Sequence, residues 1–243
     1  MVLAHYLGDA GQMAICGEGN VSGKISDGRF LVKASGTVLQ TLRPSELVEV
    51  RADTMLESLE SDMSLTDEEV TALLLAARVS GKALKPSVET LFHAWLLTLP
   101  HVQFVGHVHP IAVNQVLASL SASVFARRRM FPDQVVCCGA ESVLVPYADP
   151  GLALARHIRR RVRAFCERTG TAPKTILVRN HGIIACGSTP QDVMAALAMA
   201  EKAAAIFVGA ASLGGPVFMD PHDIARIAGR ADEHYRQKML RRM

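Results

Sequence analysis

Two apolar runs, TILVRN (175–180) and GIIAC (182–186), follow each other along the chain with only a tight turn between them. Both runs are rich in β-branched residues, as is typical of buried strands. A turn this short can join only antiparallel neighbours, because parallel strands need a crossover of about a dozen residues or more. The chain therefore cannot be built wholly from alternating strands and helices, and a sheet with antiparallel pairs is expected.

The remaining apolar runs predict the other elements. Strands are expected at 29–34, 46–50, 102–109, 135–139 and 142–148, helices at 66–81, 89–97, 149–170 and 189–211, and one or two more helices in the last thirty residues. We therefore predict an α/β fold with three layers, α/β/α, around a central, largely antiparallel mixed sheet. A single domain over residues 1–243 is expected, with its core at about 12–210 and a C-terminal tail at 211–243.

Three of the predicted helices begin with capping signals. Thr66 can accept a hydrogen bond from the backbone of Glu69 while that carboxylate reaches back, which is a capping box. Thr189 and Asp192 repeat this pattern, with a proline at the first helical position. Asp149 is expected to cap the helix that follows it.

Composition excludes several classes of protein. No run of 18 or more uncharged apolar residues is present and no basic segment leads into a long apolar one, so we expect neither a membrane span nor a secretory signal. Five cysteines, an odd number without repeated spacing, indicate free thiols in a reducing compartment. Cys137 and Cys138, adjacent on an expected strand, would point to opposite faces.

The charge pattern also bears on partners. The net charge is only +3, and the arginine-rich segments at 126–130, 156–163 and 236–243 contain almost no aromatic residues. Nucleic-acid binding would need aromatic side chains interleaved with the basic ones, so no nucleic-acid partner is expected. We predict a soluble cytoplasmic protein.

The segment GHVHP (106–110) places His107 and His109 two residues apart at the end of a predicted strand. Side chains at such spacing emerge from the same face, and Pro110 ends the strand directly behind them. Two imidazoles that point together supply two nitrogens for a metal, which binds histidine at about 2.0–2.1 Å. Taken alone, the pair could equally be metal-free histidines in the core or on the surface.

A third ligand is offered by His181, in the tight RNHG connection between the two apolar runs. Gly182 permits an unusual backbone angle there and leaves room around the imidazole. Three neutral histidines with an open fourth position would form a catalytic rather than a structural zinc site. Glu89, at the beginning of an apolar helix, is a candidate acid or base, and His93 on the same helix face is expected to be a packed or hydrogen-bonded partner.

These segments together resemble the class II aldolase/adducin family, over about residues 12–210. The resemblance is carried by GNVS (19–22), FLVKASGTVLQTLRPSELVEV (30–50), KPSVETLFH (85–93), HVHP (107–110) and RNHG (179–182), in the order and at the separations of the family. It implies the fold of the fuculose-phosphate and rhamnulose-phosphate aldolases. It also implies a homo-oligomer, commonly a cyclic homotetramer.

The resemblance assigns roles to individual residues. It makes His107, His109 and His181 the ligands of Zn²⁺, although Mn²⁺, Co²⁺ or Fe²⁺ also suit imidazoles, and it makes Glu89 the catalytic acid/base. It implies a substrate phosphate held by backbone amides, hydroxyls and the Asn20 side chain; the matching positions are Gly19, Asn20, Ser35, Gly36 and Ser87.

Three departures from the family pattern affect this pocket. Val88 replaces the second serine of the Pro-Ser-Ser-Glu motif and removes a hydroxyl donor. Glu18 stands where small or hydroxylated residues are common, and would repel a phosphate if it pointed inward. No tyrosine matches the proton donor of the fuculose-phosphate aldolases; Tyr235 in the tail is the one candidate.

The expected activity is that of a metal-dependent aldolase, a carbon–carbon lyase that cleaves a small sugar phosphate or related hydroxy-carbonyl compound through a metal-stabilised enediolate. Related reactions stay open, because the family also contains pentulose-phosphate epimerases, a methylthioribulose-phosphate dehydratase and a decarboxylase of oxo-acid phosphates. A non-catalytic interaction module, like the adducin head domain, is the alternative from a different class.

Overall fold

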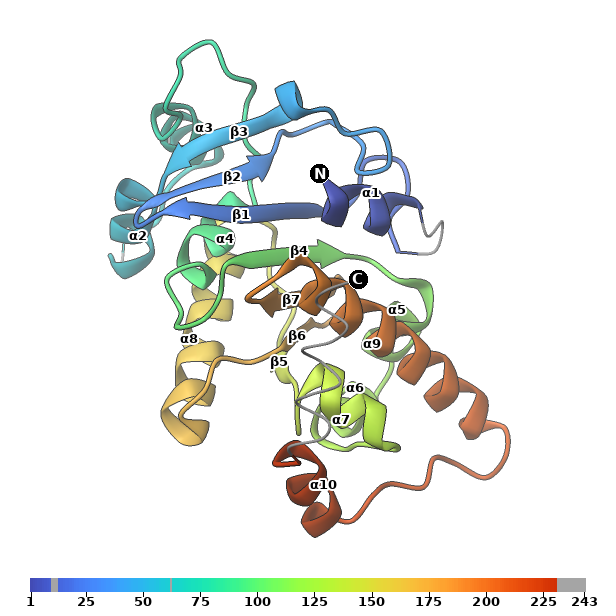
Figure 1. Cartoon of the computed structure of the whole chain (residues 1–243). Coiled ribbons are helices and arrows are strands. Elements are labelled where there is room, and N and C mark those ends of the chain that lie inside the picture. The colour runs from blue at the N-terminus through green and yellow to red at the C-terminus, as the bar shows by residue number, and fades with distance from the viewer. Residues whose placement is uncertain (10–12, 62, 231–243) are drawn as a thin grey trace.

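The centre of the protein is one seven-stranded sheet with strand order β3-β2-β1-β4-β7-β6-β5, as seen in a computed structural model that describes residues 1–9, 13–61 and 63–230 (Figure 1). All neighbours pair antiparallel except β5 and β6, which are parallel. The predicted mixed, largely antiparallel sheet is confirmed. The strands are β1 (Asn20–Ser26), β2 (Arg29–Lys33), β3 (Leu47–Arg51), β4 (Phe104–Val108), β5 (Val143–Val145), β6 (Thr175–Val178) and β7 (Gly182–Gly187).

Helices cover both faces of this sheet, which confirms the three-layer arrangement. One apolar cluster packs beneath α2 (Asp53–Glu60), α3 (Asp67–Ala76), α4 (Thr90–Leu96) and α8 (Leu152–Thr169). A second cluster, on the other face, packs beneath α1 (Val2–Asp9), α5 (Ile111–Leu117), α6 (Ala122–Arg127), α7 (Pro132–Cys138) and α9 (Pro190–Ala211). A short 3-10 turn, η1 (Pro44–Glu46), precedes β3, and α10 (Pro221–Ala228) packs on α7.

The two predicted capping boxes are present. Thr66 accepts from the Glu69 amide at the start of α3, and Thr189 accepts from the Asp192 amide at the start of α9. The predicted start of α8 is wrong. The helix begins at Leu152, and the residue that precedes it is Gly151, at φ 121°, not the expected cap Asp149. The helix α3 ends at Ala76, earlier than the predicted 81.

The prediction of a strand at 135–139 is wrong, because these residues belong to α7 and its cap. Pro132 occupies the first turn of this helix and Gly139, at φ 85°, ends it. A short apolar run does not by itself distinguish a strand from a buried helix, and here the proline and glycine that bracket it decide for the helix. Cys137 and Cys138 therefore do not emerge from opposite faces of a strand.

Within the described part of the chain, α9 is the one helix whose length and composition would allow it to cross a membrane, with a mean hydropathy of 1.7 over its most apolar window. Its buried face, which includes Val193, Leu197 and Phe207, belongs to the second apolar cluster beneath the sheet. The helix lies against β4 and β7 and packs on α5 and α7. Part of its apolar surface thus packs into the core of this domain.

Candidate metal centre

His107 and His109 stand together at the carboxyl end of β4, as the sequence predicts. Their ring centroids are 4.8 Å apart, and the two Nε2 atoms are separated by 3.0 Å. Val108 between them is fully buried in the second apolar cluster, on the opposite face of the strand. The alternation along β4 therefore directs both imidazoles to one side.

His181 reaches the same place from the turn between β6 and β7. Asn180, not Gly182, adopts the left-handed conformation in this turn, with φ 54°. Gly182 instead supplies room: a Cβ atom at this position would lie 2.5 Å from Cδ2 of His109 and 2.6 Å from the carbonyl oxygen of Val108. Only glycine lets the turn approach β4 this closely.

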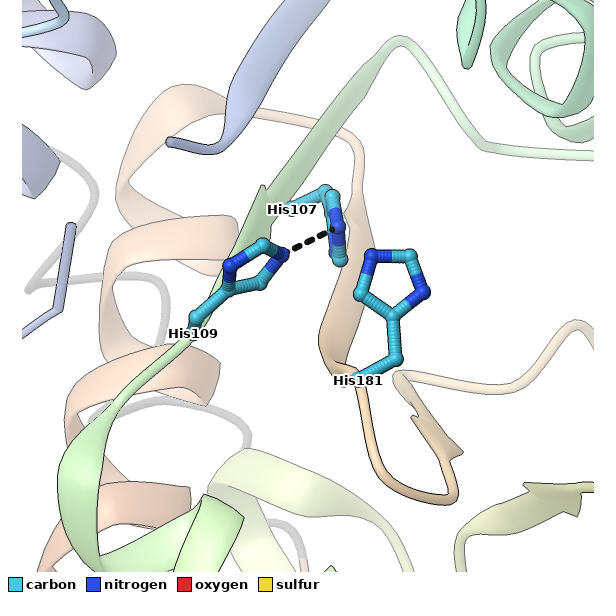
Figure 2. Close-up of side chains that lie close together, drawn as sticks. All are labelled: His107, His109 and His181. Atoms are coloured by element: carbon cyan, nitrogen blue, oxygen red, sulfur yellow. Dashed lines mark hydrogen bonds between the residues drawn. The ribbon is translucent and has the colours of Figure 1, made fainter. Parts of the chain in front are cut away.

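The three histidines form one cluster (Figure 2). The His181 ring centroid lies 4.9 Å from those of His107 and His109, and one potential ligand atom from each residue lies within 4.8 Å of the others. The Nδ1 atom of His107 lies 3.0 Å from the carbonyl oxygen of Ile183, a bond in which the ring N–H donates. This bond leaves the Nε2 lone pair of His107 directed toward the cluster.

Two imidazoles of the cluster, those of His107 and His109, are held in the neutral form. Burial lowers the pKa of His107, opposed by the negative charge of Glu89. Burial and the neighbouring His107 and His181 lower the pKa of His109 to about 4. Neutral imidazole is the form that binds a metal ion, so His107 and His109 offer nitrogens suited to coordination at neutral pH.

Glu89 faces the cluster from the residue that precedes α4. Its Oε1 atom lies 3.3 Å from Nε2 of His181 and its Oε2 atom 3.5 Å from Nε2 of His107. Burial alone would raise the pKa of this carboxyl, but its electrostatic interactions with His107 and His181 and the hydrogen bond from Asn20 outweigh burial and hold the pKa well below its ordinary value. The carboxylate is thus ionised beside the three imidazoles.

A buried polar network supports Glu89 from behind. Asn20 Nδ2 donates to Glu89 Oε2 over 2.6 Å, and Asn20 Oδ1 is bonded to Nε2 of His93. The other nitrogen of His93 lies 2.7 Å from the Ser22 hydroxyl. His93 is therefore a hydrogen-bonded partner, as expected; sequence reasoning missed Ser22 and placed Asn20 at the phosphate rather than beside His93.

The segments predicted to hold a phosphate also lie side by side. A Cβ on Gly17 would be 3.5 Å from the carbonyl oxygen of Thr37, which places the 17–20 loop beside 35–37. The Ser35 amide donates to the Lys85 carbonyl, and this joins the 35–37 turn to the segment that carries Ser87. Gly36, at φ 78°, faces open space.

Some groups in these segments already have protein partners. Both polar atoms of the Asn20 side chain are engaged by Glu89 and His93, and the Ser87 hydroxyl accepts from the Glu89 amide. Gly19 lies against β4, since a Cβ there would be 2.6 Å from the His107 carbonyl oxygen. Anion binding by the Asn20 side chain would require its present bonds to break.

The two substitutions that depart from the family pattern have clear placements. Glu18 points inward, with Oε1 3.7 Å from Nδ1 of His109. Val88 packs against the first apolar cluster, close to Gly151.

Sequence reasoning also missed Lys33, a buried lysine whose Nζ donates to the Gly17 carbonyl. The signal available in the sequence was its position on a predicted strand, between two apolar residues. Tyr235 and the basic segment 236–243 lie outside the described residues.

The sheet described above and the histidine cluster at the end of β4 can now be compared with known families. The profile of the Class II Aldolase and Adducin N-terminal domain matches residues 3–208. The chain therefore belongs to the class II aldolase/adducin family.

The relatives of this chain are named for different reactions. The chain is 29% identical over 175 residues to a methylthioribulose-1-phosphate dehydratase of Bacillus subtilis, covering 70% of this chain and 72% of that protein. It is 28% identical over 178 residues to a 3-oxo-tetronate 4-phosphate decarboxylase of Escherichia coli, covering 72% and 68%. It is 27% identical over 183 residues to the uncharacterized oxidoreductase YuxG of B. subtilis, covering 72% of this chain but only 24% of YuxG.

Solved structures share the fold. The N-terminal class II aldolase domain of a conserved protein from Thermoplasma acidophilum superposes with a TM-score of 0.69 at 24% identity, covering 85% of this chain and 91% of that one. An L-fuculose 1-phosphate aldolase superposes with a TM-score of 0.67 at 16% identity, covering 93% and 94%.

Proposed function

We propose that the protein is a divalent-metal-dependent lyase that cleaves a carbon–carbon bond in a small phosphorylated hydroxy-carbonyl compound. One observation carries this proposal: three imidazoles from two distant segments converge, and an ionised carboxylate stands 3.3 and 3.5 Å from two of them. Perturbed titratable groups gathered at one end of a sheet are typical of catalytic sites.

The residues present fit a metal ion. Three imidazoles match the ligand set of a catalytic zinc site, and Nδ1 of His181 is buried with no hydrogen-bond partner among the described residues. We assign His107, His109 and His181 as the ligands, with Zn²⁺ as the ion and Mn²⁺, Co²⁺ or Fe²⁺ as alternatives. When bound, such an ion supplies a Lewis acid that polarises carbonyl and hydroxyl oxygens of the substrate.

The side chains around the cluster would carry the remaining chemistry. Glu89 would move the proton at the carbon next to the substrate carbonyl, a role that its contact with the cluster and its burial support. The turn at Ser35 and Gly36, together with Gly19 and Ser87, would hold the phosphate, since exposed backbone N–H groups in such turns bind anions. Glu18, beside His109, would keep the anionic end of the substrate away from that side of the cluster.

A second candidate is loss of water or of carbon dioxide from a substrate of the same kind. The dehydratase and the decarboxylase are the relatives that support it, each at 28–29% identity over about 70% of this chain. Dehydration needs a polarised carbonyl and a base for the neighbouring proton. Decarboxylation needs a polarised carbonyl and an acid that protonates the carbon from which CO₂ has left, so the same residues would serve.

Metal analysis and a substrate screen test the proposal. We expect about one divalent ion per chain in the purified protein, and turnover of at least one ketose phosphate or oxo-acid phosphate that stops on chelation and returns with the metal. Products identified by mass separate cleavage from dehydration and decarboxylation. A chain that binds no divalent ion would instead support an interaction module and would end the lyase proposal.

We also infer, from the family resemblance, that the protein works as a cytoplasmic homotetramer. Size-exclusion chromatography with light scattering measures the assembly directly.

A further inference from the structure

Four buried side chains form a single line that ends at Glu89. Ser22 Oγ lies 2.7 Å from Nδ1 of His93, Nε2 of His93 is bonded to Asn20 Oδ1, and Asn20 Nδ2 lies 2.6 Å from Glu89 Oε2. Ser22, Asn20 and Glu89 are 4%, 2% and 8% exposed, and His93 is fully buried. Bulk water therefore does not compete for these bonds, and each partner is fixed by the protein.

The orientation of the Asn20 amide determines the direction of every bond in the line. Its NH₂ group faces Glu89 Oε2 over 2.6 Å and can only donate. The carbonyl oxygen of Asn20 then faces His93 and must accept, so Nε2 of His93 must carry the proton. Nδ1 of His93 is left as an acceptor and takes its hydrogen from the Ser22 hydroxyl.

His93 must be neutral for this arrangement, because a protonated ring would donate from both nitrogens. Burial and the neighbouring His107 lower the pKa of His93 to about 3, opposed by Glu89. The neutral ring has one donor and one acceptor, and both are used. The reversed arrangement would set the Asn20 carbonyl oxygen against the carboxylate, which is repulsive.

The two oxygens of Glu89 are thereby given different tasks. Oε2 is anchored by Asn20, while Oε1 has no hydrogen-bond partner among the described residues and lies 3.3 Å from Nε2 of His181. One oxygen fixes the rotation of the carboxylate, and the other is free to face the histidine cluster. A carboxylate that moves a proton needs this kind of fixed orientation.

We propose that Asn20 and His93 are positioning residues for Glu89, joined in a one-way line of hydrogen bonds that starts at Ser22 and holds the carboxylate against His107 and His181. The role differs from the phosphate contact that the family resemblance gives to the Asn20 side chain. It rests on the proposed function only in that Glu89 is the acid/base; the line of bonds itself is a property of the metal-free chain.

Two substitutions of one residue separate positioning from packing. In H93Q, the glutamine NH₂ group is as many bonds from Cα as Nε2 of histidine, so it can still donate to Asn20 while the bond to Ser22 is lost. In H93N the asparagine carbonyl can still accept from Ser22, but it cannot reach Asn20. Both variants keep a polar side chain and both leave a cavity. T90V is the matched control, because the Thr90 hydroxyl is buried on the same helix with no hydrogen-bond partner.

The first measurement uses nitrogen and amide-proton NMR of the metal-free full-length protein at neutral pH. We expect His93 to be the neutral tautomer with its proton on Nε2. We also expect a strongly downfield resonance from the side-chain NH₂ of Asn20, which should persist in H93Q and T90V and be lost in H93N. A proton on Nδ1 of His93, or an Asn20 signal unchanged in H93N, would overturn the proposal.

The second measurement uses Co²⁺ as the probe, since its visible spectrum responds to groups that approach the ion. H93Q and T90V should give the spectrum of the unmodified protein, whereas H93N should shift it, with thermal unfolding confirming that both His93 variants are equally folded. Equal spectra for H93N and the unmodified chain would contradict positioning. If Co²⁺ does not bind the unmodified chain, the metal assignment fails, and the NMR result still decides the line of bonds.

Discussion

Gly182 and His109 are packed so closely that no side chain fits between them: a Cβ on Gly182 would lie 2.5 Å from Cδ2 of His109. The contact joins the turn that carries His181 to the end of β4, where His107 and His109 stand. The separation between the two histidine segments is therefore set by the absence of a side chain at Gly182.

This contact predicts the result of G182A. The added methyl group must push the β6–β7 turn away from β4, and since the ligand atoms of the three histidines must meet at one ion, affinity for Zn²⁺ should fall by about tenfold or more. Titration against a competing chelator measures this. G81A is the control, because a Cβ on Gly81 meets nothing within 4 Å; equal zinc affinity in the two variants would mean that the turn is not held by this contact.

Replacing Glu89 by glutamine should leave metal binding largely intact and reduce turnover. Glutamine keeps the volume of the side chain but cannot take up a proton, so the rate on any substrate found by the screen should fall by about 10²- to 10⁴-fold. Metal content per chain and steady-state kinetics are measured on the same preparation. Full activity in E89Q would remove the assigned role.

The buried His93 predicts a loss of stability in acid. Its pKa falls from an ordinary value of 6.5 to about 3 in the folded protein, so protons favour the unfolded chain. The contribution of neutral His93 to the free energy of unfolding is complete above pH 6.5 and is lost as the pH falls toward 3. Between pH 7 and pH 5 it amounts to about 2 kcal/mol of the free energy of unfolding.

Urea unfolding of metal-free protein at the two pH values measures this loss. The drop between pH 7 and pH 5 should be smaller in H93Q by about 2 kcal/mol, because glutamine does not titrate. The other histidines contribute equally to both proteins and cancel in the comparison. An identical drop in H93Q would show that His93 is not held neutral by the fold.

Arg129 is buried without a carboxylate partner in hydrogen-bond reach among the described residues, and its guanidinium donates to the carbonyls of Phe125, Ala126, Arg128 and Gly139 and to the Ser142 hydroxyl. R129A would leave these acceptors unpaired in the core and should lower the free energy of unfolding by about 3 kcal/mol or more. R127A, at an exposed position of the same run, should change it by less than about 0.5 kcal/mol. Chemical denaturation of the two variants checks the difference.

The sequence predicts the parts of the site that depend on local periodicity. The spacing of His107 and His109 and the short turn at His181 follow from strand geometry, and the structure brings all three together. The fold class is predicted for the same reason, because adjacent apolar runs with tight turns must pair antiparallel. Capping boxes at Thr66 and Thr189 are equally local.

What escapes prediction depends on contacts between distant segments. Asn20 and His93 are 73 residues apart and Asn20 and Glu89 are 69 apart, so no local pattern reveals that they share hydrogen bonds. The inward direction of Glu18 likewise depends on where the 17–20 loop lies against β4. The helix α7, expected as a strand, is a different case: its apolar run is short, and Pro132 and Gly139, which bracket the run and decide for the helix, are local signals.

The central position of β4, between β1 and β7, has a consequence for biosynthesis. His107 bonds to a carbonyl 76 residues further along the chain, on the strand that follows His181. A nascent chain emerging from the ribosome cannot assemble the three imidazoles until β7 has been synthesised and has closed this long loop. Binding of a divalent ion by all three histidines would therefore require the middle of the sheet to be complete.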